Sequence, residues 1–205
     1  MRAQSKPLRL FVASSNPGKL REYRALAEPA GESVDLVFVP IFDSMAVFEE
    51  IWPTFAENAA GKALHFSRLA EGIVVADDSG LVVPALGGAP GVLSARYAGP
   101  EASDSDRLQK VLREMRGIKD REARFVCVVA VAKAGKMLGL FSASAEGILL
   151  EEPQGQDGFG YDPIFFIPAL GKTYAEISRE EKNQFSHRGK AFRKALDFLL
   201  GARAE

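Results

Sequence analysis

Short apolar runs alternate with amphipathic segments through the first third of the chain. The runs 8–14 (LRLFVAS), 34–40 (VDLVFVP) and 73–77 (IVVAD) have the length and composition of buried β-strands. Between them, residues 15–31 and 54–72 carry apolar residues at helical spacing and end near glycine. This alternation of strands and helices favours an α/β fold.

The rest of the chain groups its strands together. Residues 85–100 are rich in glycine and proline, and residues 102–117 have the polar start and basic end of a helix. Residues 123–150 predict two consecutive strands joined by a hairpin turn. A glycine-rich loop over 155–166 leads into another strand, and residues 186–202 form an amphipathic helix. The predicted fold class is α/β, a mixed twisted sheet with flanking helices and an inserted or second lobe.

Length and composition limit the number of domains. The chain has 205 residues, of which 47% are hydrophobic, enough for one sizeable core or two small lobes around a cleft. No internal repeat, low-complexity run or linker divides it. We therefore expect residues 1–205 to form one domain with two lobes.

Charge and cysteine content exclude several classes of protein. The net charge of −1 gives no whole-chain case for binding DNA or RNA, which usually needs a basic excess. The single cysteine, Cys127, rules out an intramolecular disulfide, and its apolar setting predicts a buried structural thiol. No apolar run is long enough for a signal peptide or a membrane span. These features predict a soluble cytoplasmic protein without polymeric nucleic acid or membrane as a partner.

Two adjacent carboxylates, Asp77 and Asp78, follow the apolar run in VVADDSGLVV (74–83). Ligands of α/β sheets bind beyond the carboxyl ends of strands, where these residues lie if the strand ends there. Neighbouring carboxylates repel unless a proton or cation lies between them, and Mg²⁺ prefers such oxygen ligands. The alternative is an ordinary turn with one exposed aspartate.

Further acidic residues could complete a metal site. Glu49 and Glu50 lie in an irregular segment, where functional residues concentrate. Glu57 lies in a predicted helix and could equally be a first-turn acid favoured by the helix dipole. Residue spacing does not choose among the three.

The segment ASSNPGK (13–19) lies between a predicted strand and a predicted helix. Backbone N–H groups at a helix start attract anions, and hydroxyl, amide and ammonium side chains add donors here. The segment could therefore hold phosphate, although it lacks the spacing of a P-loop. The alternative is an ordinary connecting turn with a capped helix and a solvated lysine.

Two later segments could bind a flat, polar ligand. In GFGYDP (158–163), Phe159 and Tyr161 could stack on a base, or could be core aromatics beside a turn. The segment 180–190 gathers basic side chains that could contact phosphate or base carbonyls, or could form a solvated helix end. These basic residues are Lys182, His187, Arg188 and Lys190. Together with the acids and the 13–19 turn, they fit a protein that hydrolyses the phosphate chain of a metal-bound nucleotide.

Seven segments, taken in order, resemble the inosine/xanthosine triphosphate pyrophosphatase family. They are SSNPGK, FAENAAGKA, ADDSGL, LGGAPGVLSARYAG, GFGYDPIF, KTYAEIS and EEKNQFSHRGKA, within residues 10–198. The resemblance implies a bilobed mixed α/β fold with a long central cleft, usually a homodimer. It also implies Mg²⁺-dependent hydrolysis of ITP, dITP and XTP to the monophosphate and pyrophosphate.

The resemblance further implies roles for individual residues. Asp78 would be the proton acceptor and a metal ligand, and Glu49 a second metal ligand. The triphosphate would be held by Ser14, Ser15, Asn16, Pro17, Gly18 and Lys19. Other substrate contacts would come from Ser79, Phe159, Gly160, Tyr161, Asp162, Lys182, His187 and Arg188.

Two segments depart from the family pattern. The first turn usually reads Thr-Gly-Asn, but here Ser15 stands in the glycine position and lacks the freedom of glycine at positive φ. The glutamate segment usually reads Glu-Glu-Thr-Gly, but here Ile51 and Trp52 follow the glutamates. This second departure makes Glu49 the less secure metal ligand.

Two other functions remain open from the sequence. One is a pyrophosphatase of related fold that acts on dTTP, UTP or modified pyrimidine nucleotides. The other is a module that senses nucleotides without hydrolysing them, which the retention of both aspartates disfavours.

Overall fold

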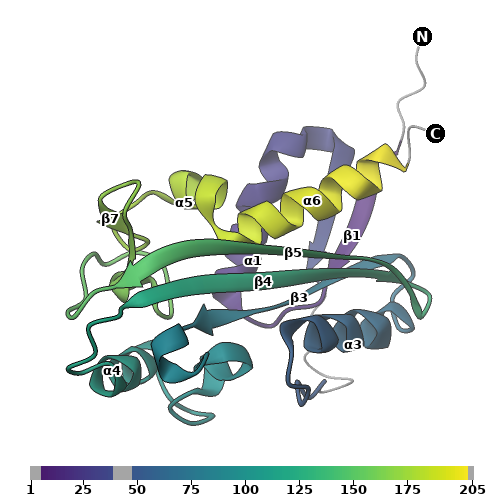
Figure 1. Cartoon of the computed structure of the whole chain (residues 1–205). Helices are drawn as coiled ribbons and strands as arrows, with labels where there is room; N and C mark the ends of the chain where they lie inside the picture. Colours follow the sequence, from purple (N-terminus) through teal and green to yellow (C-terminus); the bar gives the residue numbers. More distant parts are fainter. Residues whose placement is uncertain (1–5, 39–47, 203–205) are drawn as a thin grey trace. The chain divides into compact units, whose positions relative to one another are not determined.

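A computed structural model describes residues 6–38 and 48–202 of the chain (Figure 1). The last two residues of the predicted strand 34–40 lie outside the described residues. Within the described ranges, none of the helices combines the length and apolarity needed to span a membrane. The backbone forms one seven-stranded sheet in the order β2-β1-β3-β4-β5-β6-β7.

The sheet is mixed. The described strands are β1 (Leu8–Val12), β2 (Val34–Phe38), β3 (Ile73–Val82), β4 (Glu122–Lys133), β5 (Lys136–Leu149), β6 (Phe165–Ile167) and β7 (Lys172–Thr173). Strand β1 is parallel to both β2 and β3, whereas β6 is antiparallel to both β5 and β7. The predicted class, a mixed α/β sheet with flanking helices, is confirmed.

The chain divides into two compact units, each described separately below. Unit 1 comprises Met1–Asp78, Val128–Ser142 and Ala191–Glu205, and unit 2 comprises Ser79–Cys127 and Ala143–Lys190. Strands β3, β4 and β5 each run from one unit into the other.

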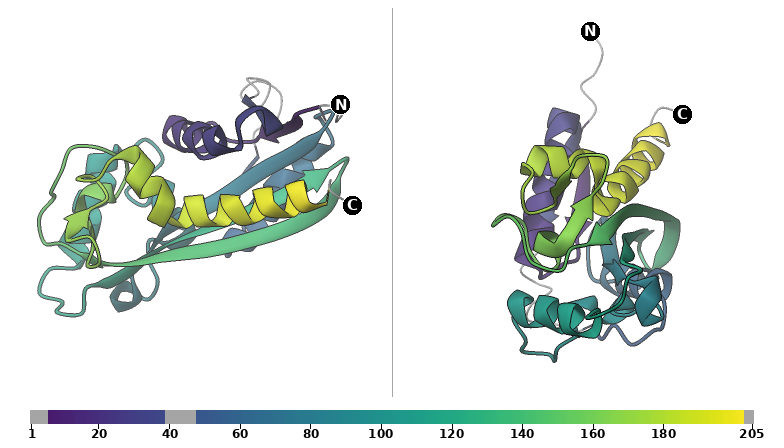
Figure 2. Two further views of the ribbon diagram at one scale, coloured as in Figure 1. Left: turned by 90° about the horizontal axis from the view of Figure 1, so that it is seen from above. Right: turned by 60° about the vertical axis from the view of Figure 1, so that its left-hand side comes forward.

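Unit 1 has helices on both faces of its strands. Helix α3 (Phe55–Ser67) packs Ala59, Ala63 and Phe66 against alternate residues of β3 and β4. Helix α1 (Pro17–Ala27) and the unit 1 part of α6 (His187–Gly201) lie on the opposite face (Figure 1; Figure 2, left). The Tyr23 and Phe192 rings of these two helices meet edge to face, with centroids 4.9 Å apart. Residues one apart on β3 therefore face different helices.

Unit 2 has its own core around helix α4 (Asp104–Glu114). The helix buries Leu108 and Val111 against the ends of β3, β4 and β5 and against Phe165. Among residues 6–38 and 48–202, the remaining elements are four 3₁₀ segments and one short helix, of which the first 3₁₀ segment lies in unit 1 and the others in unit 2. They are η1 (Glu28–Ser33), η2 (Pro84–Leu86), η3 (Gly91–Arg96), η4 (Asp162–Ile164) and α5 (Arg179–Phe185).

Most predicted elements are observed, but several predicted ends are wrong. The predicted strand 8–14 ends at Val12, and the predicted helix 54–72 ends at Ser67. The predicted strand 73–77 ends at Asp77, and the alternative for the aspartates is an ordinary turn, whereas β3 continues through Val82. Gly80 serves close packing instead, because a Cβ there would overlap the Gly91 carbonyl oxygen and Ser94 Oγ. The same Ser94 Oγ accepts a hydrogen bond from the Leu81 N–H at 2.9 Å.

The predicted burial of the Cys127 thiol is confirmed.

Because of the close approach of Ser94 to Gly80, we expect Gly80→Ala to destabilise the protein by about 1–3 kcal/mol, the usual cost of overpacking. The control is Gly201→Ala, where an added Cβ would meet no atom within 4 Å. Urea unfolding of both variants measures the difference. Equal free energies of unfolding for the two variants would show that η3 does not need the glycine.

Candidate functional site

The two adjacent aspartates of β3 point to opposite faces of the sheet. Successive side chains alternate along a strand, so Asp78 shares the face of Val74 and Ala76, which pack on α3. Asn58 of α3 accordingly donates from Nδ2 to Asp78 Oδ2 at 3.0 Å. Asp77 instead pairs with Lys19 of α1, with Oδ2 and Nζ 3.0 Å apart. Both carboxylates are almost fully buried, with exposures of 1% for Asp77 and 4% for Asp78.

Helix α3 supplies a second polar residue to the same neighbourhood. Lys62 lies one turn after Asn58 and donates from Nζ to the carbonyl oxygen of Asp77 at 2.9 Å. Its ammonium also forms an ion pair with Glu50. Residues four apart share a helix face, so α3 presents both side chains to β3.

Asn58 also fixes the segment that carries the glutamates. Its Oδ1 accepts from the Trp52 N–H at 3.1 Å, and its Nδ2 donates to the Trp52 carbonyl oxygen at 3.0 Å. The Trp52 ring stacks on Phe48, with centroids 5.5 Å apart. The departure at Ile51 and Trp52 is therefore accommodated by a packed, hydrogen-bonded segment that directs Glu50 toward Lys62.

The charge on Asp78 is costly in these surroundings. Burial, and next the carboxylate of Glu50, raise the pKa of Asp78 from 3.8 to about 6. Lys19, Lys62 and the Asn58 hydrogen bond oppose this rise but do not cancel it. An added cation beside Asp78 would relieve the same cost as a proton does.

The other two candidate glutamates differ from Glu50. Glu57 closes the start of α3, where its carboxylate accepts from Thr54 Oγ1 at 2.6 Å and its N–H donates back at 3.2 Å. The helix-start alternative for Glu57 is thus correct. The side chain of Glu49 is exposed. Across residues 6–38 and 48–202, no three His, Cys, Asp or Glu side chains gather closely enough to hold a metal by themselves.

The turn before α1 is a capped helix start. Asn16 Oδ1 accepts from the Lys19 N–H at 3.1 Å, and Ser14 Oγ accepts from the Asn16 N–H at 3.3 Å. Pro17 occupies the first turn, Gly18 is buried, and Ser15 and Asn16 are exposed. Ala134 alone among the described non-glycine residues has positive φ, so Ser15 causes no strain of that kind. Lys19 forms an ion pair with Asp77, so the alternative prediction of a solvated lysine is wrong.

In unit 2, a second group of side chains surrounds Phe159. Asp162 is buried, and its Oδ2 accepts from the Phe159 N–H at 2.8 Å and from Lys182 Nζ at 2.5 Å. The Lys182 ammonium lies 4.8 Å from the centroid of the Phe159 ring, within range of a cation–π interaction. The Arg188 guanidinium lies 5.9 Å from the same centroid.

Buried cations distinguish this group from a solvated helix end. Arg188 is only 2% exposed and donates from Nη2 to Ser79 Oγ at 2.7 Å. His187 is buried with its ring stacked on Phe125 at 4.8 Å. Lys190 is exposed, so the solvated alternative holds for it alone among the four basic residues. Tyr161 is a core aromatic whose hydroxyl donates to the Ser94 carbonyl oxygen at 2.9 Å.

Comparison with known proteins assigns the chain to a family. The Ham1 family matches residues 10–198. The chain belongs to this family. A dITP/XTP pyrophosphatase of Geobacillus kaustophilus is 48% identical over 188 residues, covering 90% of this chain and 91% of that protein. A dITP/XTP pyrophosphatase of Bacillus subtilis is 43% identical over 192 residues, covering 92% and 96%.

Solved structures of the Ham1 family have the same fold. The Staphylococcus aureus Ham1 protein superposes with a TM-score of 0.83 at 36% identity, covering 95% of this chain and 99% of that one. A HAM1 protein from Coxiella burnetii superposes with a TM-score of 0.83 at 40% identity and the same coverage.

Sequence reasoning assigned no role to Asn58 or Lys62 of this Ham1-family chain. Both lie in FAENAAGKA, where they interrupt an apolar helical pattern at a spacing of four residues. That spacing places both side chains on one face of the helix, and this polar face is the sequence feature that indicates a role for them. Their contacts with Asp78 and with the Asp77 backbone need the fold, because they join residues 20 and 15 positions apart.

The raised pKa of Asp78 gives a test by pH. The folded protein binds a proton at Asp78 more tightly than the unfolded chain, so stability falls as pH rises from about 4 through about 6. Asp78→Asn removes this charge. The ion pairs of Lys19 with Asp77 and of Lys62 with Glu50 remain in the variant. We expect the variant to gain up to about 3 kcal/mol over the wild type near neutral pH, at about 1.4 kcal/mol per pKa unit.

Urea unfolding of both proteins in EDTA, at about pH 4.5 and about pH 7.5, measures this difference. The advantage of the variant should grow with pH. An advantage that is the same at both pH values would mean that the Asp78 carboxyl titrates like an exposed one.

Proposed function

We propose that this protein is a nucleoside-triphosphate pyrophosphatase that hydrolyses the non-standard purine nucleotides ITP, dITP and XTP to the monophosphate and pyrophosphate. The observation that carries the proposal is Asp78, a buried carboxylate with a raised pKa, set beside Asn58 and within the field of Lys19, Lys62 and Glu50. The names of the relatives, dITP/XTP pyrophosphatase, supply the substrate class.

Unit 1 would bind the triphosphate and a divalent cation. The N-terminus of α1, with Ser14, Ser15, Asn16 and Lys19, offers donors of the kind that hold phosphate. Asp78 offers oxygen to Mg²⁺, with Glu49 or Glu50 as a second ligand. This donor set fits Mg²⁺, which takes one or two carboxylates and completes its shell with water and substrate phosphates. Bound Mg²⁺ would neutralise charge that develops on the phosphate oxygens.

Asp78 is proposed as the general base. A carboxylate with a pKa of about 6 is deprotonated at neutral pH yet accepts a proton more readily than an ordinary aspartate. It would take a proton from water as the water oxygen attacks the α-phosphorus. The bond from the α-phosphorus to the bridging oxygen then breaks, and pyrophosphate leaves. Lys19 and the N–H groups at the start of α1 would stabilise the departing negative charge.

Unit 2 would bind the purine base. Phe159 would stack on the purine ring. Lys182 and Arg188 would donate hydrogen bonds to oxygens of the base, and His187, next to Arg188 in the chain, would also contact the substrate. ITP and XTP carry an acceptor oxygen at position 6, whereas ATP carries a donor amino group. A buried donor left without a partner costs about 1–3 kcal/mol, so two such contacts would favour ITP over ATP strongly.

We further propose a domain organisation, a cellular location and an oligomeric state for the enzyme. Residues 1–205 would act as one catalytic domain, in the cytoplasm and as a homodimer, as the family resemblance implies. The ligand would be a free nucleotide, since the net charge of −1 does not favour polymeric nucleic acid.

A substrate panel tests the function. We expect pyrophosphate release from ITP, dITP and XTP at least about 30-fold faster than from ATP, as two lost hydrogen bonds would produce. The release should stop in EDTA and return with Mg²⁺. Asp78→Asn should reduce the rate by about 100-fold or more, the range of a lost general base. The matched control is Asp197→Asn, an exposed residue of α6.

Each alternative function gives its own result in the same panel. Faster release from dTTP or UTP than from ITP would identify a pyrimidine nucleotide pyrophosphatase. Tight binding of ITP without any hydrolysis would identify a nucleotide sensor. Orthophosphate in place of pyrophosphate would contradict attack at the α-phosphorus.

A further inference from the structure

An acidic residue of α4 holds the loop that carries Phe159. Asp104, the first residue of α4, accepts a hydrogen bond at Oδ2 from the Gly160 N–H at 2.8 Å. The two residues are 56 positions apart in the chain. The contact therefore ties the start of a helix to a loop from a different part of unit 2.

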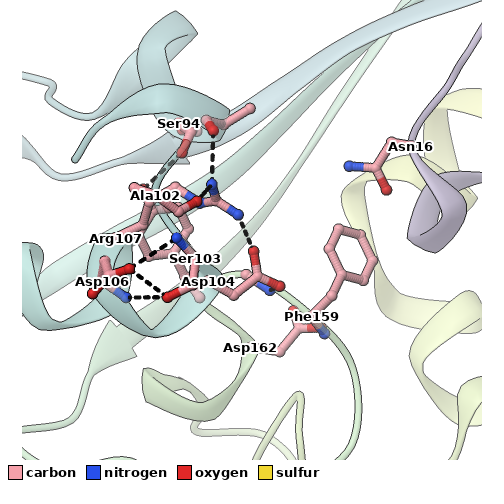
Figure 3. Close-up of polar contacts among 12 residues, drawn as sticks. Asn16, Ser94, Ala102, Ser103, Asp104, Asp106, Arg107, Phe159 and Asp162 are labelled. Atoms are coloured by element: carbon pink, nitrogen blue, oxygen red, sulfur yellow. Dashed lines mark hydrogen bonds and ion pairs between the residues drawn. The ribbon is translucent and has the colours of Figure 1, made fainter. Parts of the chain in front are cut away.

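Arg107 holds Asp104 in place. Its guanidinium forms an ion pair with Asp104 Oδ1, as Figure 3 shows. Its Nη1 also donates to the carbonyl oxygens of Ala95, at 3.0 Å, and of Ala102. One planar side chain thus fixes the aspartate against the backbone on both sides of the 97–101 segment.

Asp104 is not needed to cap its own helix. Ser103 Oγ accepts from the Asp106 N–H at 3.1 Å, and Asp106 Oδ2 accepts from the Ser103 N–H at 2.9 Å. These reciprocal bonds form a complete capping box at the start of α4 (Figure 3). The contact from Asp104 to Gly160 is a separate feature.

The loop itself needs an external support. Phe159 lies between Gly158 and Gly160, which have φ values of +79° and +63°. Glycine adopts this region freely, so its neighbouring peptide groups rotate at little cost. Asp162 fixes the Phe159 N–H, and Asp104 fixes the next N–H, each at 2.8 Å. The peptide groups on both sides of Phe159 are therefore held by carboxylates.

We propose that Asp104, oriented by Arg107, is a positioning residue that fixes the Phe159 loop for binding of the purine base. This inference rests on the proposed function, in which Phe159 stacks on the base. Asp104 acts through the Gly160 backbone and does not touch the substrate. Its loss would leave the phosphate chemistry of Asp78 and Lys19 intact but would allow the Phe159 ring to move out of its stacking position.

Steady-state kinetics with XTP and dITP test the positioning role. We expect Asp104→Ala to raise KM by about 10- to 100-fold, the effect of losing one hydrogen bond to a charged group, with kcat changed by less than about twofold. Inhibition by pyrophosphate, which has no base, should be unchanged. Asp104→Asn keeps an acceptor for the Gly160 N–H and should raise KM less than Asp104→Ala.

The matched control is Asp106→Ala, which removes a first-turn acid from the same helix and breaks the capping box. Its KM should stay within about twofold of the wild type, because the hydrogen bonds of Asp106 in Figure 3 join it to Ser103 of its own helix start. Equal KM values for Asp104→Ala and Asp106→Ala would overturn the proposal, since the effect would then come from the helix start alone.

Hydrogen exchange of the free protein gives a readout that does not depend on activity. Backbone N–H groups of residues 158–162 should exchange faster in Asp104→Ala than in the wild type, and at the wild-type rate in Asp106→Ala. Unchanged exchange in Asp104→Ala, or faster exchange without a rise in KM, would overturn the proposal. A wild type that hydrolyses neither XTP nor dITP would instead contradict the proposed function, while exchange still decides whether Asp104 holds the loop.

Discussion

The buried carboxylate of Asp78 determines how unit 1 is arranged around β3. A charge with 4% exposure is stable only where opposite charges or hydrogen bonds compensate for lost water. Asn58 provides the hydrogen bond, and Lys19 and Lys62 provide positive charge, but burial and then the Glu50 carboxylate raise the pKa of Asp78 by more than these lower it. The free protein therefore holds a carboxylate that is ready to accept a proton or a cation near neutral pH.

The alternation of side chains along β3 explains why two aspartates stand together. Asp77 faces α1 and neutralises Lys19, whereas Asp78 faces α3 and meets Asn58. Lys62 is bound to the carbonyl oxygen of Asp77 and to Glu50, which places its charge between the pair and the glutamate segment. The first aspartate thus pairs with a cation on one face, and the second is held by an amide on the other. One aspartate in a strand cannot serve both faces.

The sequence predicts the elements well because their signals are local. The apolar repeat of α3, the capping residues of α4 and the hairpin between β4 and β5 all depend on neighbours within a few positions. The end of β3 differs from the prediction because Ser79 and Gly80 are residues typical of turns, while the close approach of Ser94 that requires Gly80 is not local. The contact of Asp104 with Gly160 was missed for the same reason. Family resemblance named Asp78, Lys182 and Arg188, but only the fold shows that each is buried with a defined partner.

The role of Asp78 depends on the pKa of its carboxyl in the metal-free protein, which can be measured. Carbon-13 NMR of aspartate carboxyl groups measures it, with Asp78→Asn assigning the resonance by its disappearance. We expect a midpoint of about 6 for the titration of Asp78. A midpoint near 3.8, the ordinary value for an aspartate, would mean that Lys19 and Lys62 fully compensate the charge, and Asp78 would then lack the basicity proposed for it.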